Sequence, residues 1–276
     1  MSTREGYRAR LETLYFSQAS LKAFRTCPRK FRYRYLDGLF WPRQYEDSAR
    51  QAAMERGEAF HTLAQRYYAG LPCAAPGDLP DAEKLTAWLE ALKEFAPREE
   101  GGTYFPEQHL RMSREELRLQ ARYDLIRVDP SGRVTIYDWK TEAGLPKKVY
   151  LQASLQTVLY LYLFVEAGGA YVPGGKVSPE NVSLVYWNPQ HPASPLTFGY
   201  TAARHSRYGK LLRQLTESIL ALDYEDFTVA ADERVCQACE YHPICFGRRA
   251  PGEEIEEDEV LDEELLRWED VPEIPY

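Results

Sequence analysis

Long apolar segments are absent from this sequence. None of its apolar runs approaches the roughly 18 residues that a membrane-spanning helix needs, and residues 1–16, MSTREGYRARLETLYF, contain no apolar stretch of the kind that a signal peptide carries. Internal repeats are absent as well. The composition, 44% hydrophobic and 13% aromatic, is ample for a packed core. We therefore expect a globular, cytoplasmic protein without a membrane anchor.

Basic residues are scarce at the C-terminal end. Residues 251–276 hold 12 acidic residues and one basic residue, whereas the 250 residues before them hold 33 basic and 30 acidic residues. The net charge of −8 therefore comes from this tail, and the mildly basic body leaves nucleic-acid binding open. Such like-charge blocks usually stay flexible and solvated. Alternatively, Val260, Leu265 and Trp268 belong to an amphipathic segment that docks on a partner or covers the protein's own basic surface.

The pattern of apolar residues predicts an α/β protein. Ser17 is a typical N-cap, and Pro28 ends or restarts the helix that follows it. Asp129-Pro130-Ser131-Gly132 is a strong turn sequence between two alternating segments, which predicts a hairpin. The expected helices cover residues 17–27, 46–70, 81–95, 149–166 and 207–222, and the expected strands cover 116–128, 133–141, 181–188 and about 195–202. This order is typical of a sheet flanked by helices.

The predicted hairpin carries charged residues on an otherwise apolar face. Because side chains alternate along a strand, Asp138 and Lys140 extend the face that Val134 and Ile136 begin. Burying this pair is costly unless a group such as a metal uses it, although an ordinary ion pair at a frayed strand end is the commoner case. A five-residue connection sets Asp124 opposite Asp138, and a four-residue turn requires a bulge to do so.

Two carboxylates this close repel each other unless a divalent cation lies between them. Oxygen ligands of this kind suit Mg2+ or Mn2+. Lys140 is then placed to orient or deprotonate an attacking water, while the metal lowers the pKa of that water and stabilises charge on a scissile phosphate. The hairpin is therefore predicted to be a metal-dependent catalytic site.

The order of Asp124 and then Asp138-Trp139-Lys140 resembles the signature of PD-(D/E)XK nucleases. Gly57 and His61 match the Gly-x-x-x-His pattern that the RecB-like branch of this superfamily carries on a helix before the hairpin. The resemblance implies that His61 is a metal ligand together with Asp124 and Asp138, and that the backbone carbonyl of Trp139 adds another. Without the resemblance, a lone helical histidine is more often structural.

Two further segments extend the resemblance. Gln156 and Tyr160 match the Gln-x-x-x-Tyr motif of the RecB-like branch, and their spacing puts them on one face of a helix, where they are expected to position the DNA strand. Glu107 falls where such nucleases often have an acid, which implies another metal ligand. One feature departs from the family, which often has glycine two or three residues before the first aspartate, where this chain has Ala121-Arg122-Tyr123.

The five cysteines are unlike a disulfide framework, because a cytoplasmic location is expected. Cys236 and Cys239 form a C-x2-C, Cys245 follows, and Cys27 lies far away before a proline and aromatic residues, while Cys73 is left over as a free thiol. Grouped thiolates select Zn2+ or an iron-sulfur cluster, and composition alone favours zinc. The arrangement is similar to the nuclease domains of AddB-type subunits and of CRISPR-associated spacer-acquisition exonucleases, which implies a 4Fe-4S cluster.

The segment after Cys27 is basic and aromatic. Its cations could follow a phosphate backbone while its aromatic rings stack on bases, as in single-strand binders. A helix that buries its aromatic rings while arginine and lysine side chains reach the surface fits the pattern equally well. The candidate DNA-binding residues are Arg29, Lys30, Arg32 and Arg34.

The sequence is therefore interpreted as an α/β nuclease with a restriction-endonuclease-like core, in which a mixed central sheet is flanked by helices and a metal cluster joins the N- and C-terminal segments. The expected domain covers residues 15–250, after an N-terminal extension of residues 1–14 and before the acidic tail. Its expected activity is Mg2+- or Mn2+-dependent hydrolysis of DNA, as a single-strand exonuclease acting on free ends in repair, recombination or CRISPR-type defence.

A phosphate-binding loop is absent, because GGKVS around Lys176 lacks the G-x4-GK[ST] spacing. The chain is therefore not expected to unwind DNA, and a separate helicase or CRISPR integration proteins are the expected partners. Two other hypotheses stay open. One is a catalytically silent iron-sulfur subunit that binds DNA within a helicase-nuclease complex, and the other is a zinc-bound scaffold that does not touch DNA.

Overall fold

The computed structural model describes residues 3–39, 48–75, 77, 81–144, 147–237 and 239–247. The acidic tail of residues 251–276, for which we expect flexibility or a docking segment, lies outside the described residues.

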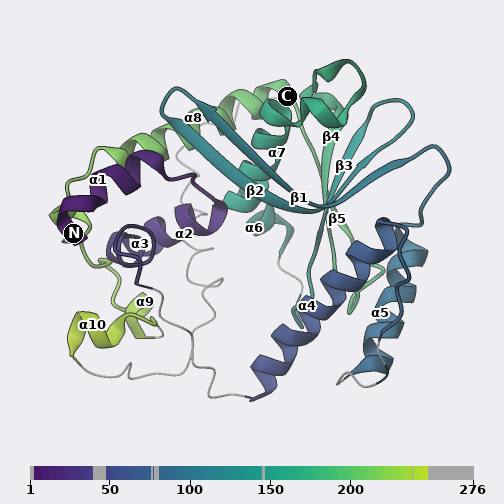
Figure 1. Cartoon of the computed structure of the whole chain (residues 1–276), viewed down its shortest axis with the longest axis horizontal. Coiled ribbons are helices and arrows are strands. Elements are labelled where there is room, and N and C mark those ends of the chain that lie inside the picture. The colour runs from purple at the N-terminus through teal and green to yellow at the C-terminus, as the bar shows by residue number, and fades with distance from the viewer. Residues whose placement is uncertain are drawn as a thin grey trace.

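A five-stranded mixed sheet forms the centre of the fold (Figure 1). Its strands follow one another in space in the order of the sequence. They are β1 (Thr103–Arg114), β2 (Leu117–Val128), β3 (Val134–Trp139), β4 (Val182–Trp187) and β5 (Leu196–Gly199). β3 and β4 are parallel and the other neighbours are antiparallel. The expected α/β fold with a mixed sheet is confirmed.

Helices cover both faces of this sheet (Figure 1). On one face, α7 (Leu155–Ala167) packs against β1, β2 and β4, and α2 (Gln18–Thr26) and α8 (Ala202–Leu220) pack against α7. On the other face, α4 (Ser48–Tyr68) packs against β1, β2 and α5 (Ala82–Phe95). A parallel pair needs such a crossover, and α7 lies in the one between β3 and β4.

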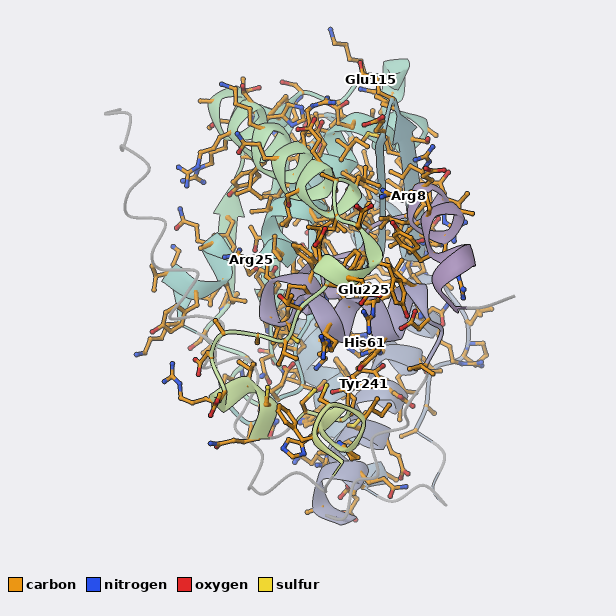
Figure 2. The ribbon with its side chains drawn as sticks, turned by 90° about the vertical axis from the view of Figure 1, so that its left-hand side faces the viewer. Arg8, Arg25, His61, Glu115, Glu225 and Tyr241 are labelled. Carbon is orange, nitrogen blue, oxygen red and sulfur yellow. The ribbon has the colours of Figure 1, made fainter. Side chains whose placement is uncertain are left out.

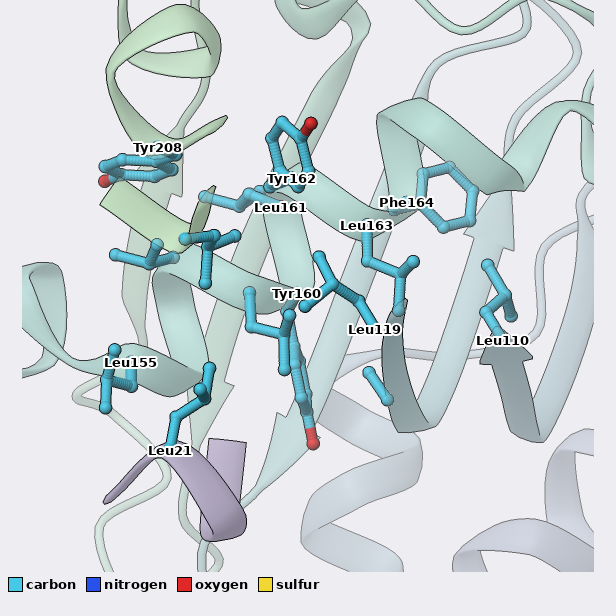
Figure 3. Packing of buried hydrophobic residues seen from close by; sticks show 14 of the residues in the cluster. Leu21, Leu110, Leu119, Leu155, Tyr160, Leu161, Tyr162, Leu163, Phe164 and Tyr208 are labelled. Atoms are coloured by element: carbon cyan, nitrogen blue, oxygen red, sulfur yellow. The ribbon is translucent and has the colours of Figure 1, made fainter. Parts of the chain in front are cut away.

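Two hydrophobic cores result from these layers. Val134 and Ile136 of β3 belong to the larger core, and Tyr137 and Trp139 belong to the smaller one, so β3 is buried on both faces. α7 is apolar almost all round, as expected for a helix enclosed between a sheet and other helices. Figure 3 shows its leucines, among them Leu163, beside the strands.

The N-terminal helices pack into the larger core. They are α1 (Thr3–Thr13), α2, α3 (Pro28–Phe31) and a π-helical turn, η1 (Arg32–Leu36). The expected cap is confirmed, because the Ser20 backbone N–H donates to Ser17 Oγ at 3.2 Å. Leu11 of α1 is completely buried, and Arg8 donates to the Leu220 carbonyl at 2.6 Å. Residues 1–14, expected to be an extension, thus include a helix that is part of the packed structure.

The last described helices lie on the same side of the molecule as the first ones (Figures 1 and 2). They are the short α9 (Arg234–Gln237) and α10 (His242–Phe246). The Tyr241 hydroxyl, at the start of α10, donates to the Leu39 carbonyl at 2.7 Å. Short 3-10 helices complete the described elements: η2 (Gly168–Tyr171), η3 (Pro173–Gly175), η4 (Pro179–Asn181) and η5 (Tyr224–Asp226).

Three elements differ from the expected ones. The helix expected over residues 149–166 is divided into α6 (Lys148–Ala153) and α7, because Ser154 is extended and caps α7 through the Thr157 N–H. α8 begins earlier than residue 207, because Thr201 caps it. β1 is missing from the expected strands. It contains Pro106, which an edge strand accommodates because one side of its ladder is unpaired.

Within the described part of the chain, no helix combines the length and the apolar character that crossing a membrane requires.

Candidate metal and active site

The connection between β2 and β3 decides how their acids face each other. Val128 pairs with Val134, so the connection has the five residues 129–133, not the four of the expected turn. Asp129 stabilises it by accepting from the Ser131 N–H at 2.8 Å, and Gly132 adopts a φ of 82° that favours glycine. The hairpin therefore needs no bulge to bring its acids together.

Three acidic residues consequently lie in a row across β1, β2 and β3. The registers of the two ladders set Glu107 opposite Asp124, and Asp124 opposite Asp138 just beyond the last β2–β3 pair. At this point Asp124 Oδ2 accepts the backbone N–H of Trp139 at 2.7 Å. The first aspartate therefore closes the open end of the hairpin and lies beside the Trp139 backbone.

The alternation of buried side chains reverses at two of these acids. In β2, odd-numbered residues up to Tyr123 face the larger core, and even-numbered residues from Ile126 onward do so. β1 shows the same reversal around Glu107, whose φ of 52° lies in the left-handed region. The two reversals place Glu107 and Asp124 at the junction of the two cores, where neither carboxylate has to enter an apolar layer.

His61 approaches these carboxylates from α4. Its Nδ1 lies 3.4 Å from Asp124 Oδ1 and 4.0 Å from Glu107 Oε1. One ligand atom from each of the three residues lies within 4.8 Å of the others. Figure 2 shows His61 near the middle of the molecule. One imidazole nitrogen and two carboxylates are a donor set that suits Mg2+ or Mn2+.

The pKa shifts of this group indicate a surplus of negative charge. Burial lowers the pKa of His61, but its hydrogen bond with Asp124 and the charge of that residue outweigh burial and raise it. Burial and the charge of Asp124 raise the pKa of Glu107, although Arg122 opposes them. A divalent cation would compensate this charge, so the residues present fit a metal.

Asp138 lies next to this group but is bound to other partners. Lys140 Nζ lies 2.8 Å from Asp138 Oδ2, and Gln156 Nε2 donates to Asp138 Oδ1 at 2.6 Å. Lys140 Nζ also donates to Gln156 Oε1 at 3.0 Å, which closes a triangle. Burial raises the pKa of Asp138 to about 6, with Lys140 opposing the shift. Burial lowers the pKa of Lys140, but Asp138 raises it more, so the amine stays charged.

Tyr160, one turn after Gln156, supports this triangle. It is 8% exposed, its ring centroid lies 4.9 Å from that of Tyr123, and its hydroxyl bonds to Gln156. Figure 3 shows the hydroxyl pointing away from the leucines of α7. Burial raises the pKa of Tyr160 well above its ordinary value, so the hydroxyl keeps its proton. The expected Gln-x-x-x-Tyr pair is therefore joined to Lys140 and Asp138 by hydrogen bonds.

A loop that the sequence analysis did not single out holds the segment after Lys140. Side chains of the β4–β5 connection donate to the backbone carbonyls of residues 141–143: Gln190 at 2.7 Å, Asn188 at 2.8 Å and His191 at 2.9 Å. Asn188 is completely buried. The polar sequence NPQH directly after an apolar strand is the signal that points to such a role.

Gly57 of the Gly-x-x-x-His motif packs against the same segment. A Cβ atom at this position would lie 2.8 Å from Thr141 Oγ1, closer than real contacts allow. The glycine therefore lets α4 approach the residue after Lys140, which brings His61, one helical turn further on, to the carboxylates.

We expect Gly57→Ala and Thr141→Ala to be coupled in their effects on the free energy of unfolding. With Thr141→Ala already present, Gly57→Ala should stabilise by about 0.5–1 kcal/mol, because alanine is the better helix former. With Thr141 present, the clash should cancel or reverse this gain. Urea unfolding of the four proteins in the double-mutant cycle measures the coupling. Equal effects of Gly57→Ala in both backgrounds would contradict a close contact.

Four of the five cysteines meet at the side of the molecule where both described ends lie. Cys27 caps α3, and Cys236, Cys239 and Cys245 come from α9, α10 and the segment between them. All four line one pocket, together with Lys30 and His242. Cys73 is apart from them, packed against the smaller core.

Hydrogen-bond donors surround these sulfur atoms. The Lys30 N–H donates to Cys27 Sγ at 3.5 Å, the Tyr33 hydroxyl bonds to Cys245, and a backbone N–H of Tyr241 bonds to Cys239. Burial raises the pKa of the Cys239 thiol to about 12. Thiolates gathered here therefore need a compensating cation, and the donor set fits a thiolate-bound metal or cluster.

The basic segment after Cys27 presents only part of its charge to solvent. Lys30 and Arg32 are 7% and 8% exposed, and they pair with Glu240 at 3.0 Å and with Asp37 at 3.5 Å. The side chains of Arg29 and Arg34 are half-buried, and that of Arg34 is 40% exposed. Of the four candidate DNA-binding residues, the structure thus leaves Arg29 and Arg34 partly accessible, with Arg34 4.0 Å from Glu240, and buries the other two in ion pairs.

The chain is similar to a known protein family and to solved structures. Residues 15–246 match the model of the PD-(D/E)XK nuclease superfamily. A crystal structure from Eubacterium rectale, of a protein provisionally named as an exonuclease, is 15% identical with a TM-score of 0.51, over 94% of this chain and 97% of that chain. The crystal structure of SSO0001 is 17% identical with a TM-score of 0.37, over 90% and 95%. No curated protein matches. Because the family model spans most of the sequence, the chain belongs to the PD-(D/E)XK nuclease superfamily.

Proposed function

We propose that the protein is a DNA nuclease of the RecB-like branch that uses Mg2+ or Mn2+ and degrades single-stranded DNA from an end. The proposal rests mainly on one observation: two clusters of charged side chains lie next to each other at the open end of the β2–β3 hairpin. His61, Glu107 and Asp124 form the candidate metal group, and the Asp138–Lys140 pair lies directly beside it.

His61, Glu107 and Asp124 would hold the metal, with Asp138 and the backbone carbonyl of Trp139 as further ligands. A bound divalent cation would act as a Lewis acid that makes water a better nucleophile and stabilises charge on the phosphate.

The chain's own contribution centres on Lys140. Because its amine stays protonated beside Asp138, Lys140 orients the attacking water and stabilises developing negative charge as a donor, rather than removing a proton. Gln156 bridges Lys140 and Asp138 and fixes their distance, while Tyr160 fixes Gln156. The four residues act as one hydrogen-bonded unit.

We propose further that Cys27, Cys236, Cys239 and Cys245 bind a 4Fe-4S cluster. What supports the proposal is that all four thiols line one pocket and that hydrogen-bond donors lie beside three of them. The cluster would hold α9 and α10 against α3. A separate helicase or CRISPR integration proteins would supply the DNA end.

The test is cleavage of end-labelled single-stranded DNA by protein purified without oxygen. Mn2+, Mg2+ and EDTA are compared, and wild type is compared with Asp124→Asn, which keeps the size of the side chain and removes its charge. We expect cleavage with either metal, none with EDTA and none by the variant. Labels at the 5′ or 3′ end give the polarity, and circular DNA distinguishes exonuclease from endonuclease activity.

Other outcomes would contradict the proposal in different ways. DNA binding without cleavage would favour the catalytically silent subunit. Failure to bind DNA at low salt, also after removal of residues 251–276, would favour the scaffold. Equal cleavage by wild type and Asp124→Asn would place the active site elsewhere.

A further inference from the structure

Arg122 lies beside the candidate metal group on the face of the sheet that carries α4. Residues of β2 before Asp124 alternate, and Tyr123 faces the larger core while Arg122 faces the opposite side. Arg122 Nε donates to Glu107 Oε2 at 2.6 Å, and Glu107 Oε1 faces His61. Glu107 therefore has one oxygen toward the metal group and the other toward Arg122.

Most of this guanidinium is free for another ligand. Its side chain is 73% exposed, whereas that of Glu107 is 8% exposed. Arginine has five N–H donors, and Glu107 is the one partner that the Arg122 guanidinium has among the described residues. An ion pair this exposed adds little to stability, so stability does not account for a guanidinium at this position.

The net charge of the site indicates what the exposed guanidinium of Arg122 could bind. With His61 neutral and one divalent cation bound, the three carboxylates, Lys140 and Arg122 leave one net positive charge, and without Arg122 no net charge remains. An anion drawn to the metal group would lie next to the exposed N–H donors, and a planar guanidinium matches two oxygens of a phosphate.

Resting on the proposed function, we propose that Arg122 binds a phosphate of the DNA strand at the active site, while its Nε holds Glu107 in place. It is thus both a substrate-binding residue and a positioning residue for Glu107.

The test is the salt dependence of single-stranded DNA binding with Mn2+ present. The parent is Asp138→Asn/Lys140→Met, which removes both members of the buried pair and prevents cleavage. Arg122→Gln should lower the magnitude of the slope of log Kd against log salt by about 0.7, the value for one phosphate contact on a single strand, and weaken binding to all sequences alike. Arg122→Lys should keep the slope.

Arg213→Gln is the matched control. Arg213 also pairs with a glutamate, Glu115 at 2.9 Å, and is 45% exposed. Figure 2 shows Glu115 well away from His61. We expect an unchanged slope for this variant. Circular dichroism and calorimetric titration with Mn2+ show for every variant whether fold and metal binding persist.

The outcomes separate this inference from the proposed function. An unchanged slope for Arg122→Gln, with binding by the parent intact, overturns the phosphate contact and leaves a role in holding Glu107, which a weaker Mn2+ affinity would reveal. An equal loss for Arg213→Gln also overturns it, because the effect would then be general. A parent and a wild type that do not bind DNA at low salt overturn the proposed function and this inference together.

Discussion

Replacing Lys140 with methionine is expected to abolish DNA cleavage and to lower the free energy of unfolding by about 3 kcal/mol. Removing one positioned donor that stabilises developing charge typically lowers a rate by about 10²–10³-fold, and methionine keeps the length of the side chain without its charge. The loss of stability follows because Asp138 is 4% exposed and loses its cationic partner. Cleavage of labelled DNA and urea unfolding at pH 7 measure the two effects.

The double variant Asp138→Asn/Lys140→Met separates the effect on cleavage from the effect on stability. It leaves no unpaired buried charge, so stability should return toward wild type while cleavage stays absent. The loss of stability in Lys140→Met should also shrink as the pH falls, since the raised pKa of Asp138, about 6 in the wild type, lets the carboxyl become neutral. A single variant as stable as wild type at pH 7 would contradict a buried ion pair, and restored cleavage in the double variant would contradict a catalytic Lys140.

If the proposed cluster is present, Cys236→Ser is expected to remove it and to lower the free energy of unfolding by at least about 4 kcal/mol, among the largest effects of a single substitution. α9 and α10 have four and five residues, too few to be stable alone, so their attachment would depend on the ligands. Visible absorption, iron and sulfide analysis and thermal unfolding without oxygen measure the effect.

Cys73→Ser is the control, because that thiol lies away from the pocket of the other four. It should keep iron, colour and stability. Stoichiometric zinc without iron in the wild type would replace the cluster by a zinc site. Normal stability of Cys236→Ser would contradict a structural role for any metal at these residues.

The core of the site could be predicted from the sequence because its parts are local. The turn at Gly132 joins two strands that follow each other directly in the sequence, which brings Asp124, Asp138 and Lys140 together whichever register holds. The i, i+4 spacing of Gln156 and Tyr160 likewise fixes their common face. In these segments the local conformational preference agrees with the tertiary packing, and such agreement allows the structure to be predicted from the sequence.

Other parts depend on contacts that local patterns do not reveal. β1 contains Pro106, a residue that is uncommon within strands, and the alternation of its side chains reverses at Glu107. Both features weaken the period-two pattern by which a strand is recognised in a sequence. Burial of Lys30 depends on Glu240, more than 200 residues away in the sequence. A pattern of cations and aromatic rings cannot distinguish a DNA-binding surface from such an ion pair.

The loop that holds the segment after Lys140 has a consequence for the order of folding. The β2–β3 hairpin closes over five residues, but the hydrogen bonds to residues 141–143 come from side chains 46 to 49 residues further along. Distant contacts cost more loop-closure entropy and form later than local ones. We therefore expect the acids of the hairpin to assemble first and Lys140 to reach its final position last, so that a partly folded chain could gather the acids of the site before it could cut DNA.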